Sequence, residues 1–309
     1  MAYRLRRQES IPRGLRRLAA KELASARDQL QKTNPSDGRA IRDARKSVKK
    51  VRAILKLIRA DGGRGLGESR KRLRDVNRKL SRVRDADAML EILEKLKRMS
   101  PRVFDEHTVA RLRRRLDAHK HESRRAAQSD QAWKKVDREL GWLKLAAKRW
   151  RPAHQRFGAI AAGIRITYRR GRKALRRAER LRRAADFHEW RKEMKALRYQ
   201  LRLVEESSPA LRKDIRALHR AESWLGDDHN LVVLVAALAK GPARNELEPI
   251  LRAVNLYQRR LRDKTIASAK TVYAAAPRKF VRGIKREWNA WRKRDRRLGP
   301  RKPKRAAAA

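Results

Sequence analysis

The chain has 309 residues, and its 87 Lys and Arg against 34 Asp and Glu give a formal net charge of +53. A charge this large indicates a polyanionic partner, such as nucleic acid, an anionic membrane or a phosphate polymer. The lack of Cys excludes disulfides, zinc fingers and thiol chemistry, and a hydrophobic content of 40% is far from that of a disordered chain.

Helix is predicted for nearly the whole chain, because apolar residues recur every three or four positions and no stretch keeps alternating between apolar and polar residues. The turn Asn34-Pro35-Ser36-Asp37-Gly38 ends one helix and caps the next, which Asp61-Gly62-Gly63 closes. Further boundaries are expected at Ser100-Pro101, Arg151-Pro152, Ser208-Pro209, Gly241-Pro242 and Ala276-Pro277.

Targeting and membrane segments are not expected. The longest apolar run, residues 231–239, is too short to span a bilayer. Residues 1–10 are charged and lack the apolar stretch of a secretory signal peptide. We therefore expect a soluble, cytoplasmic protein.

Two segments occur in both halves of the chain, in the same order. Residues 41–52 and 187–198 share their pattern of apolar and basic positions at an offset of 146. Residues 80–85 match residues 225–230 at an offset of 145. Such an internal repeat predicts that the chain contains one helical unit twice.

The repeat defines the expected architecture. We expect an all-α fold of two antiparallel helical bundles, related by a pseudo-twofold axis around a basic central groove. A single domain would span residues 5–295, as repeat 1 (about 5–150) and repeat 2 (about 151–295). The basic segment 296–309 is expected to be a disordered tail.

A row of cations lies beside the apolar stripe of each repeated helix. In the first helix the row is Arg42, Arg45, Lys49, Arg52 and Lys56, widened by Lys46 and Lys50; in the second it is His188, Arg191, Lys195, Arg198 and Arg202. Each pair of like charges three or four positions apart costs stability, by roughly a few tenths of a kcal/mol. Asp43 is the only acid between Arg39 and Arg59, so the repulsion is not relieved and the rows predict an anion-binding surface.

The helix that opens each half adds further cations. They are Arg13, Arg16, Arg17 and Lys21 in the first half, and Arg169, Arg172, Lys173 and Arg176 in the second. These side chains are candidates for the walls of the same groove, although the sequence does not determine which way they face. The mixture of Arg forks and compact Lys charges suits a linear phosphate chain, and no reader of base edges is apparent.

The second repeated helix carries a recognisable motif. Phe187-His188-Glu189-Trp190-Arg191-Lys192, followed by Lys195 and Leu197-Arg198-Tyr199, resembles the signature helix of the CHAD family, the conserved histidine α-helical domain. Leu225-Gly226-x-x-His229-Asn230 is similar to its second signature, which usually shows His-Asp; Tyr168–Arg172 and Tyr273–Phe280 also fit. The resemblance covers about residues 5–295. It implies a basic groove or pore between two helical bundles that binds inorganic polyphosphate, and association with polyphosphate granules.

The resemblance assigns residues position by position. It implies groove roles for His188, Arg191, Lys192, Lys195, Arg198 and Tyr199, with Arg45, Lys46, Lys49 and Arg52 as counterparts in the first half. The first half departs from the family where Arg42 replaces a frequent histidine and Arg84 aligns with His229. Some family members are fused to a triphosphatase domain, whose Glu-x-Glu-x-Glu strand this chain lacks.

Neither enzyme activity nor a cofactor or metal site is predicted. The segment 62–67 lacks the preceding strand and the Gly-Lys-Ser/Thr ending of a phosphate-binding loop. Carboxylates that would hold Mg²⁺ for polyphosphate chemistry are scarce in the basic helices. His119 and His121 point to different faces of a helix, and Asp227-Asp228-His229 has no complete ligand set around it.

Sequence-independent binding of DNA or RNA, as by a nucleoid protein, is the alternative function, because it needs only cations within reach of phosphates. Seven Trp residues could stack on bases, but Trp190 lies on the apolar stripe. The preferred prediction is non-catalytic binding of polyphosphate at granules, with nucleic acid as a secondary polyanion. The complete predicted binding set is Arg13, Arg17, Arg42, Arg45, Lys46, Lys49, Lys50, Arg52, Arg169, Arg172, Lys173, His188, Arg191, Lys192, Lys195, Arg198, Tyr199, Arg202 and His229.

Overall fold

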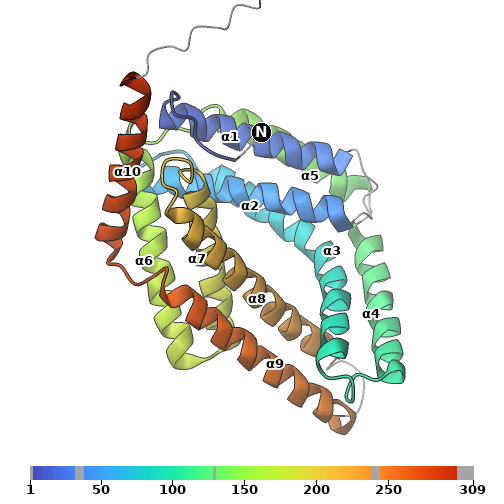
Figure 1. Ribbon diagram of the computed structural model, residues 1–309. Helices are drawn as coiled ribbons and strands as arrows, with labels where there is room; N and C mark the ends of the chain where they lie inside the picture. The colour runs from blue at the N-terminus through green and yellow to red at the C-terminus, as the bar shows by residue number, and fades with distance from the viewer. Residues whose placement is uncertain (1–2, 32–37, 128–129, 239–243, 298–309) are drawn as a thin grey trace, which may run out of the picture.

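The computed structural model describes residues 3–31, 38–127, 130–238 and 244–297, without the side chains of 82–87, 115, 119–127, 130–132, 244–247 and 295–297. The described residues form ten α-helices and no strand (Figure 1), which confirms the prediction of an all-α fold. The helices are α1 (Ile11–Gln31), α2 (Gly38–Ala60), α3 (Gly67–Met99), α4 (Glu106–Ala127), α5 (Asp130–Ala147), α6 (Gly158–Leu181), α7 (Ala184–Arg202), α8 (Leu211–Leu238), α9 (Arg244–Lys270) and α10 (Pro277–Arg297). None of these described helices has the length and apolar character needed to cross a membrane.

Most helix boundaries follow from local turn chemistry. Gly62, directly after α2, has a φ of 85°, a left-handed conformation that glycine adopts without strain. Pro277 begins α10, as expected for a residue that cannot continue a preceding helix. The boundary between α6 and α7 was missed, because Arg182 closes α6 with a φ of 54° and no Gly or Pro stands there.

Several predicted features fall on residues outside the described ranges. These are most of the turn at 34–38, the Gly241-Pro242 boundary and the basic tail from residue 298 onward. The side chains of Arg84, His119 and His121 also lie outside the described set.

Two hydrophobic clusters form the interior. The larger one joins α1, α2, α5, α6, α7 and α10 with the N-terminal parts of α3 and α8 and the end of α9. The smaller one joins the C-terminal parts of α3 and α8 with α4 and α9. Each cluster therefore combines helices from both halves of the chain, so the two halves pack together. The internal duplication and its pseudo-twofold axis stay predictions.

The apolar stripes predicted for the two repeated helices are buried, with at most 4% of any side chain exposed. They comprise Ile41, Ala44, Val48, Val51, Leu55 and Ile58 along α2, and Phe187, Trp190, Met194, Leu197, Leu201 and Val204 along and just after α7. Helix α6 also crosses α2 at close range, since a Cβ atom at Gly163 would lie 2.6 Å from Cδ2 of Leu57. Burial of the stripes turns the neighbouring cation rows toward the space between α2 and α7.

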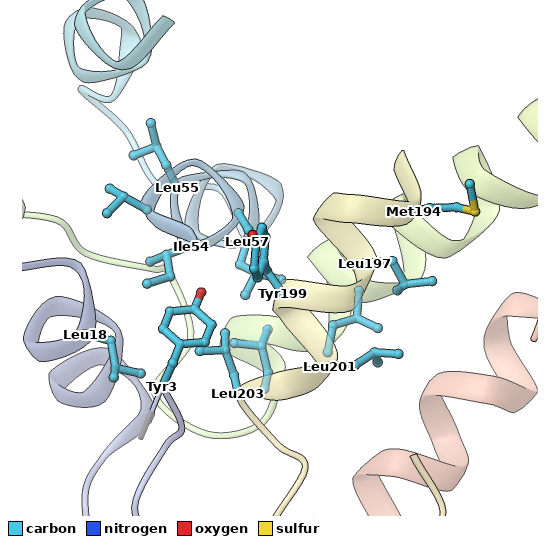
Figure 2. Packing of buried hydrophobic residues seen from close by; sticks show 14 of the residues in the cluster. Tyr3, Leu18, Ile54, Leu55, Leu57, Met194, Leu197, Tyr199, Leu201 and Leu203 are labelled. Carbon is cyan, nitrogen blue, oxygen red and sulfur yellow. The ribbon is translucent and has the colours of Figure 1, made fainter. Parts of the chain in front are cut away.

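The N-terminal segment packs against the junction of α2 and α7 (Figure 2). The ring of Tyr3 lies edge-on to that of Tyr199, with 6.3 Å between the centroids. The Tyr3 hydroxyl donates to the Lys50 carbonyl at 3.2 Å, and the Leu5 amide donates to the Leu203 carbonyl at 2.9 Å. These contacts hold the Tyr199 ring in place.

Helix α10 is held on α6 by the two aromatic motifs noted in the sequence. The Tyr168 hydroxyl lies 2.9 Å from the Val272 carbonyl and 3.0 Å from that of Ala275. The Tyr168 ring stacks on Phe280 with 4.2 Å between centroids. Gly171 gives Tyr273 room to approach, because a Cβ atom there would lie 2.4 Å from the Tyr273 hydroxyl. These motif residues are structural, and they do not line the cavity described next.

Candidate functional site

A cavity of about 740 Å³ opens between α2, α3, α7 and α8. Ten Lys and Arg side chains of the described chain line it, against two Glu and two His. The cations are Arg42, Arg45, Lys49, Arg52, Lys56 and Arg59 on α2, Arg70 on α3, and Arg191, Lys192 and Lys195 on α7. We call this cavity the cationic groove. This composition gives the cavity a strongly positive electrostatic potential, which would attract an anion.

Ten residues of the sequence-based set line the cationic groove: Arg42, Arg45, Lys49, Arg52, His188, Arg191, Lys192, Lys195, Tyr199 and His229. They come from three helices, α2, α7 and α8, and the α2 and α7 rows face the same space. All five residues of the α2 row and three of the five residues of the α7 row therefore face one groove.

The other nine residues of that set lie outside the groove. Lys46 and Lys50 each follow a groove residue, and one step along a helix turns a side chain by about 100°. Lys50 consequently pairs with Glu22 of α1 at 2.7 Å, while Arg17 pairs with Glu9. Arg13, Lys46, Arg169 and Lys173 are exposed elsewhere, Arg172 and Arg202 are half-buried, and Arg198 is buried behind the groove wall.

Two amines that line the groove, Lys49 of α2 and Lys195 of α7, have strongly lowered pKa values. Burial lowers the pKa of Lys49 to about 6, and the positive charges of Lys195 and Arg45 add to the shift. Burial also lowers the pKa of Lys195, to about 8, although the charge of Glu222 opposes this. No carboxylate of the described residues lies within ion-pair distance of Lys49. An anion in the groove would therefore restore the proton on Lys49.

A buried carboxylate, Glu222 of α8, holds the α7 wall in place. It lies 2.9 Å from the Lys195 ammonium and accepts a 2.8 Å hydrogen bond from Nε of Arg198. Burial alone would raise the pKa of Glu222, but these two cations lower it to about 2. Arg198 also lies over the Tyr199 ring, 4.5 Å from its centroid. Arg198 thus positions Lys195 and Tyr199 from behind the groove wall.

The signature glycine of α8 makes room for a groove arginine. A Cβ atom at Gly226 would lie 3.0 Å from Nη2 of Arg191. Nε of Arg191 donates to the main-chain carbonyl of Glu222 at 3.3 Å, which directs the guanidinium along α8. The Leu225-Gly226 motif therefore has a steric role in orienting Arg191.

Two histidines lie together in the groove wall. The rings of His188 and His229 are 4.5 Å apart at their centroids. Burial lowers the pKa of His229 to about 4, with His188 and Arg191 contributing. Burial, Lys192 and Arg191 also lower the pKa of His188, whose Nδ1 is buried without a hydrogen-bond partner in the described chain. Near neutral pH both rings are uncharged and offer hydrogen bonds.

Carboxylates neutralise some of the groove cations. Glu91 of α3 pairs with Arg42 at 2.7 Å. Glu193 pairs with Lys56 at 2.5 Å, and Glu189 pairs with Lys192 at 2.5 Å. A bound anion would have to compete with these acids. Among the described residues, Lys49 and Arg52 have no carboxylate partner of this kind.

Sequence reasoning left several lining residues out of the binding set. Lys56 and Arg59 continue the α2 row by the same period and were detectable from it. Arg70, Asn77 and Ser81 come from α3, whose approach no local pattern reveals; Ser81 accepts a 3.0 Å hydrogen bond from Arg45. Among the described residues, no group of three or more His, Cys, Asp or Glu side chains is arranged to hold a metal ion.

The fold and the cavity define the class of the protein, an all-helical protein with a polycationic groove. The family model of the CHAD domain matches residues 21–239, more than half of the chain. The chain therefore belongs to the CHAD domain family, as the resemblance of its motifs indicated. The crystal structure of the CHAD domain from the plant Ricinus communis is similar, with a TM-score of 0.51 and 22% identity over 89% of this chain and 92% of that one. Among curated proteins no significant match is found.

Proposed function

We propose that the cationic groove binds inorganic polyphosphate, and that the protein is a binding protein and not an enzyme. The observation that carries the proposal is the pair of rows on α2 and α7, which face one cavity with ten cations against two carboxylates. A linear phosphate chain repeats a negative charge at short intervals, so it can meet cations from both walls at every helical turn. Membership of the CHAD family favours polyphosphate as the chain in question.

Groove size and lining favour polyphosphate over nucleic acid. A duplex is too wide for a cavity of about 740 Å³ between four helices. A single strand could enter, but sequence-independent binding of a single strand relies on aromatic platforms for its bases. Tyr199, His188 and His229 are the only ring side chains among the described lining residues, and Trp190 is fully buried in the core.

Binding without turnover is the chemistry that the lining supports. Hydrolysis or transfer of a phosphoryl group would require carboxylates that hold Mg²⁺ near the phosphates. The two lining carboxylates, Glu189 and Glu193, are each already paired with a lysine. We expect no release of orthophosphate when the protein is incubated with long-chain polyphosphate and Mg²⁺. We further propose a cytoplasmic location at polyphosphate granules, which a fluorescent fusion would test.

A comparison of two triple variants tests the groove directly. The groove variant combines Lys49→Gln, Arg52→Gln and Lys192→Gln. Its control combines Arg13→Gln, Lys46→Gln and Lys173→Gln, three exposed cations outside the groove. Both variants replace three basic side chains with neutral amides. Isothermal titration with long-chain polyphosphate at physiological salt should show an affinity loss of about 100-fold or more for the groove variant, on the order of 1 kcal/mol for each lost contact.

The control variant should stay within about threefold of the wild-type Kd. Equal losses in both variants would mean that net charge alone attracts the ligand, and the groove assignment would be wrong. A second result against polyphosphate would be its displacement by duplex DNA at equal phosphate concentration. Circular dichroism should show unchanged helicity in both variants, because none of the six side chains is in the core.

A further inference from the structure

Helix α10 carries a second row of cations, well separated in sequence from those of the groove. Its described members are Arg278, Lys279, Arg282, Lys285, Arg286 and Lys293, and all six side chains are exposed. They follow the three-to-four-residue period of one helix face and extend over about 21 Å between Lys279 and Lys293. We call them the α10 row. None of them lines the cationic groove.

The opposite face of α10 is fully engaged with the core. Val281, Ile284, Trp288 and Trp291 are buried, and the Trp288 ring lies 6.2 Å from that of Phe157. Helix α6 is its main partner, and α10 runs along one side of the molecule (Figure 1). The α10 row is therefore presented outward on a rigid support.

The charges of the α10 row are not balanced by acids, in contrast to several exposed cations on α3 and α4. There, Arg78 pairs with Asp75 at 3.1 Å, and Arg113 pairs with Glu94. Within the described residues, no carboxylate lies within ion-pair distance of any member of the α10 row. Like charges at this spacing destabilise a helix unless a polyanion shares them.

We propose that the α10 row is a second anion-binding surface, which binds the phosphate backbone of duplex nucleic acid independently of the cationic groove. The row lies on an outward face, so a wide, stiff partner can reach it, whereas only a thin chain fits between α2 and α7. Binding through this row would be independent of sequence, because contacts from Lys and Arg to phosphate groups carry no sequence information. A membrane is less suited, since the apolar face of α10 is already buried.

The test uses the full chain and one charge-matched control. The row variant combines Lys279→Glu, Arg282→Glu and Arg286→Glu. The control combines Lys97→Glu, Arg113→Glu and Arg252→Glu, which are partly or fully exposed, ion-paired cations on α3, α4 and α9. Binding to a 30-base-pair DNA duplex is measured by fluorescence anisotropy over a series of salt concentrations. Binding to long-chain polyphosphate is measured in parallel, and thermal unfolding checks that each variant is folded.

The row variant should lose about 30-fold or more in duplex affinity, and the slope of log K against log salt should fall by about three, one for each lost phosphate contact. Its polyphosphate affinity should stay within about threefold of the wild type, whereas the groove variant should show the reverse pattern. An equal loss of duplex binding in the charge-matched control would overturn the proposal. So would a row variant that loses polyphosphate but not DNA, or a wild-type protein that binds anionic vesicles but not the duplex.

Discussion

The carboxylate of Glu222 lies 2.9 Å from the ammonium group of Lys195, and both side chains are largely buried between α7 and α8. The two walls of the cationic groove differ in whether a buried amine has a carboxylate partner. Lys195 has an internal counter-ion, which Glu222 shares with Arg198, whereas Lys49 on the opposite wall has none among the described residues. Lys195 on the α7 wall is therefore charged before an anion binds, whereas Lys49 on the α2 wall becomes fully charged only when an anion is bound.

Replacing Glu222 with Gln should destabilise the fold by about 3 kcal/mol, because it leaves Lys195 and Arg198 buried without a counter-ion. The pKa of Glu222 is lowered to about 2 in the fold, from an ordinary value of 4.5. Its contribution is therefore present above pH 4.5 and lost as the pH falls toward 2. Denaturant unfolding at pH 7 and pH 3 should show a smaller difference from the wild type at the lower pH.

The matched control is Glu206→Gln, whose partner Arg4 has a half-exposed side chain. It should cost less than about 0.5 kcal/mol. Polyphosphate should raise the unfolding temperature of Glu222→Gln more than that of the wild type, because the ligand supplies the missing negative charge. If Glu222→Gln unfolds like Glu206→Gln, the carboxylate does not hold the wall.

The helices and their inward faces could be predicted from the sequence because the helical period determines which residues share a face. The stripe from Ile41 to Ile58 identified the buried face of α2, and the row from Arg42 to Lys56 lies beside it. The facing of the opening helices could not be predicted, and Arg13 and Lys173 proved to lie outside the groove. Their direction depends on which neighbour covers each helix.

Side-chain partners that are distant in sequence explain the remaining differences between the predicted and the observed lining of the groove. Arg198 shares a predicted row with Lys195, but Glu222, 24 positions further along, draws it behind the wall. From the sequence alone, joint replacement of Arg191, Lys195 and Arg198 by Glu is the natural test of binding. The structure makes that test ambiguous, because Arg198→Glu would place two carboxylates together in a buried site. The groove variant with Lys49, Arg52 and Lys192 avoids this problem.

Polyphosphate binding should be coupled to proton uptake by Lys49. Without an anion its pKa is about 6, so above this pH the amine is mostly neutral, and a bound phosphate chain favours the charged form. Affinity should therefore fall as the pH rises from 6 to 8, by up to about tenfold for each unit. Lys195, with a pKa of about 8, keeps its charge over most of that range.

Titration calorimetry at pH 7.5 in two buffers with different ionisation enthalpies measures this uptake. The wild type should take up close to one proton for each Lys49 that engages the ligand. Lys49→Arg should take up far less, because a guanidinium stays charged. Equal apparent enthalpies in both buffers for the wild type would rule out the coupling.

Gly226→Ala should weaken polyphosphate binding without weakening the fold. The new Cβ atom would lie 3.0 Å from Nη2 of Arg191, so the guanidinium must shift by a few tenths of an ångström. We expect an affinity loss of about fivefold, equivalent to about 1 kcal/mol. Stability should be unchanged or slightly higher, because Ala favours helix over Gly. Gly283→Ala on α10, where nothing lies within 4 Å, is the control and should leave the Kd unchanged. If the Gly226→Ala protein binds polyphosphate as tightly as the control, the Leu225-Gly226 motif has no steric role in orienting Arg191.

His229→Arg should strengthen polyphosphate binding at pH 7. Burial and neighbouring cations hold the pKa of His229 near 4, so its ring is neutral at that pH, whereas Arg adds a permanent charge. The predicted sequence repeat aligns His229 with Arg84, so an arginine at this position is suggested by the chain's own sequence. The Kd for polyphosphate should fall by about three- to tenfold. The unfolding temperature of the free protein should also fall, because the added charge repels Arg191.

His229→Gln is the neutral comparison for this variant. It keeps a hydrogen-bonding side chain without charge, so its Kd at pH 7 should stay within about threefold of the wild type. A loss as large as that of Lys192→Gln would mean that the imidazole is protonated in the complex, contrary to the expectation. The NMR titration of the His229 ring, with and without polyphosphate, would then locate its pKa in each state directly and decide whether the histidine pair contributes charge or only hydrogen bonds to the bound chain.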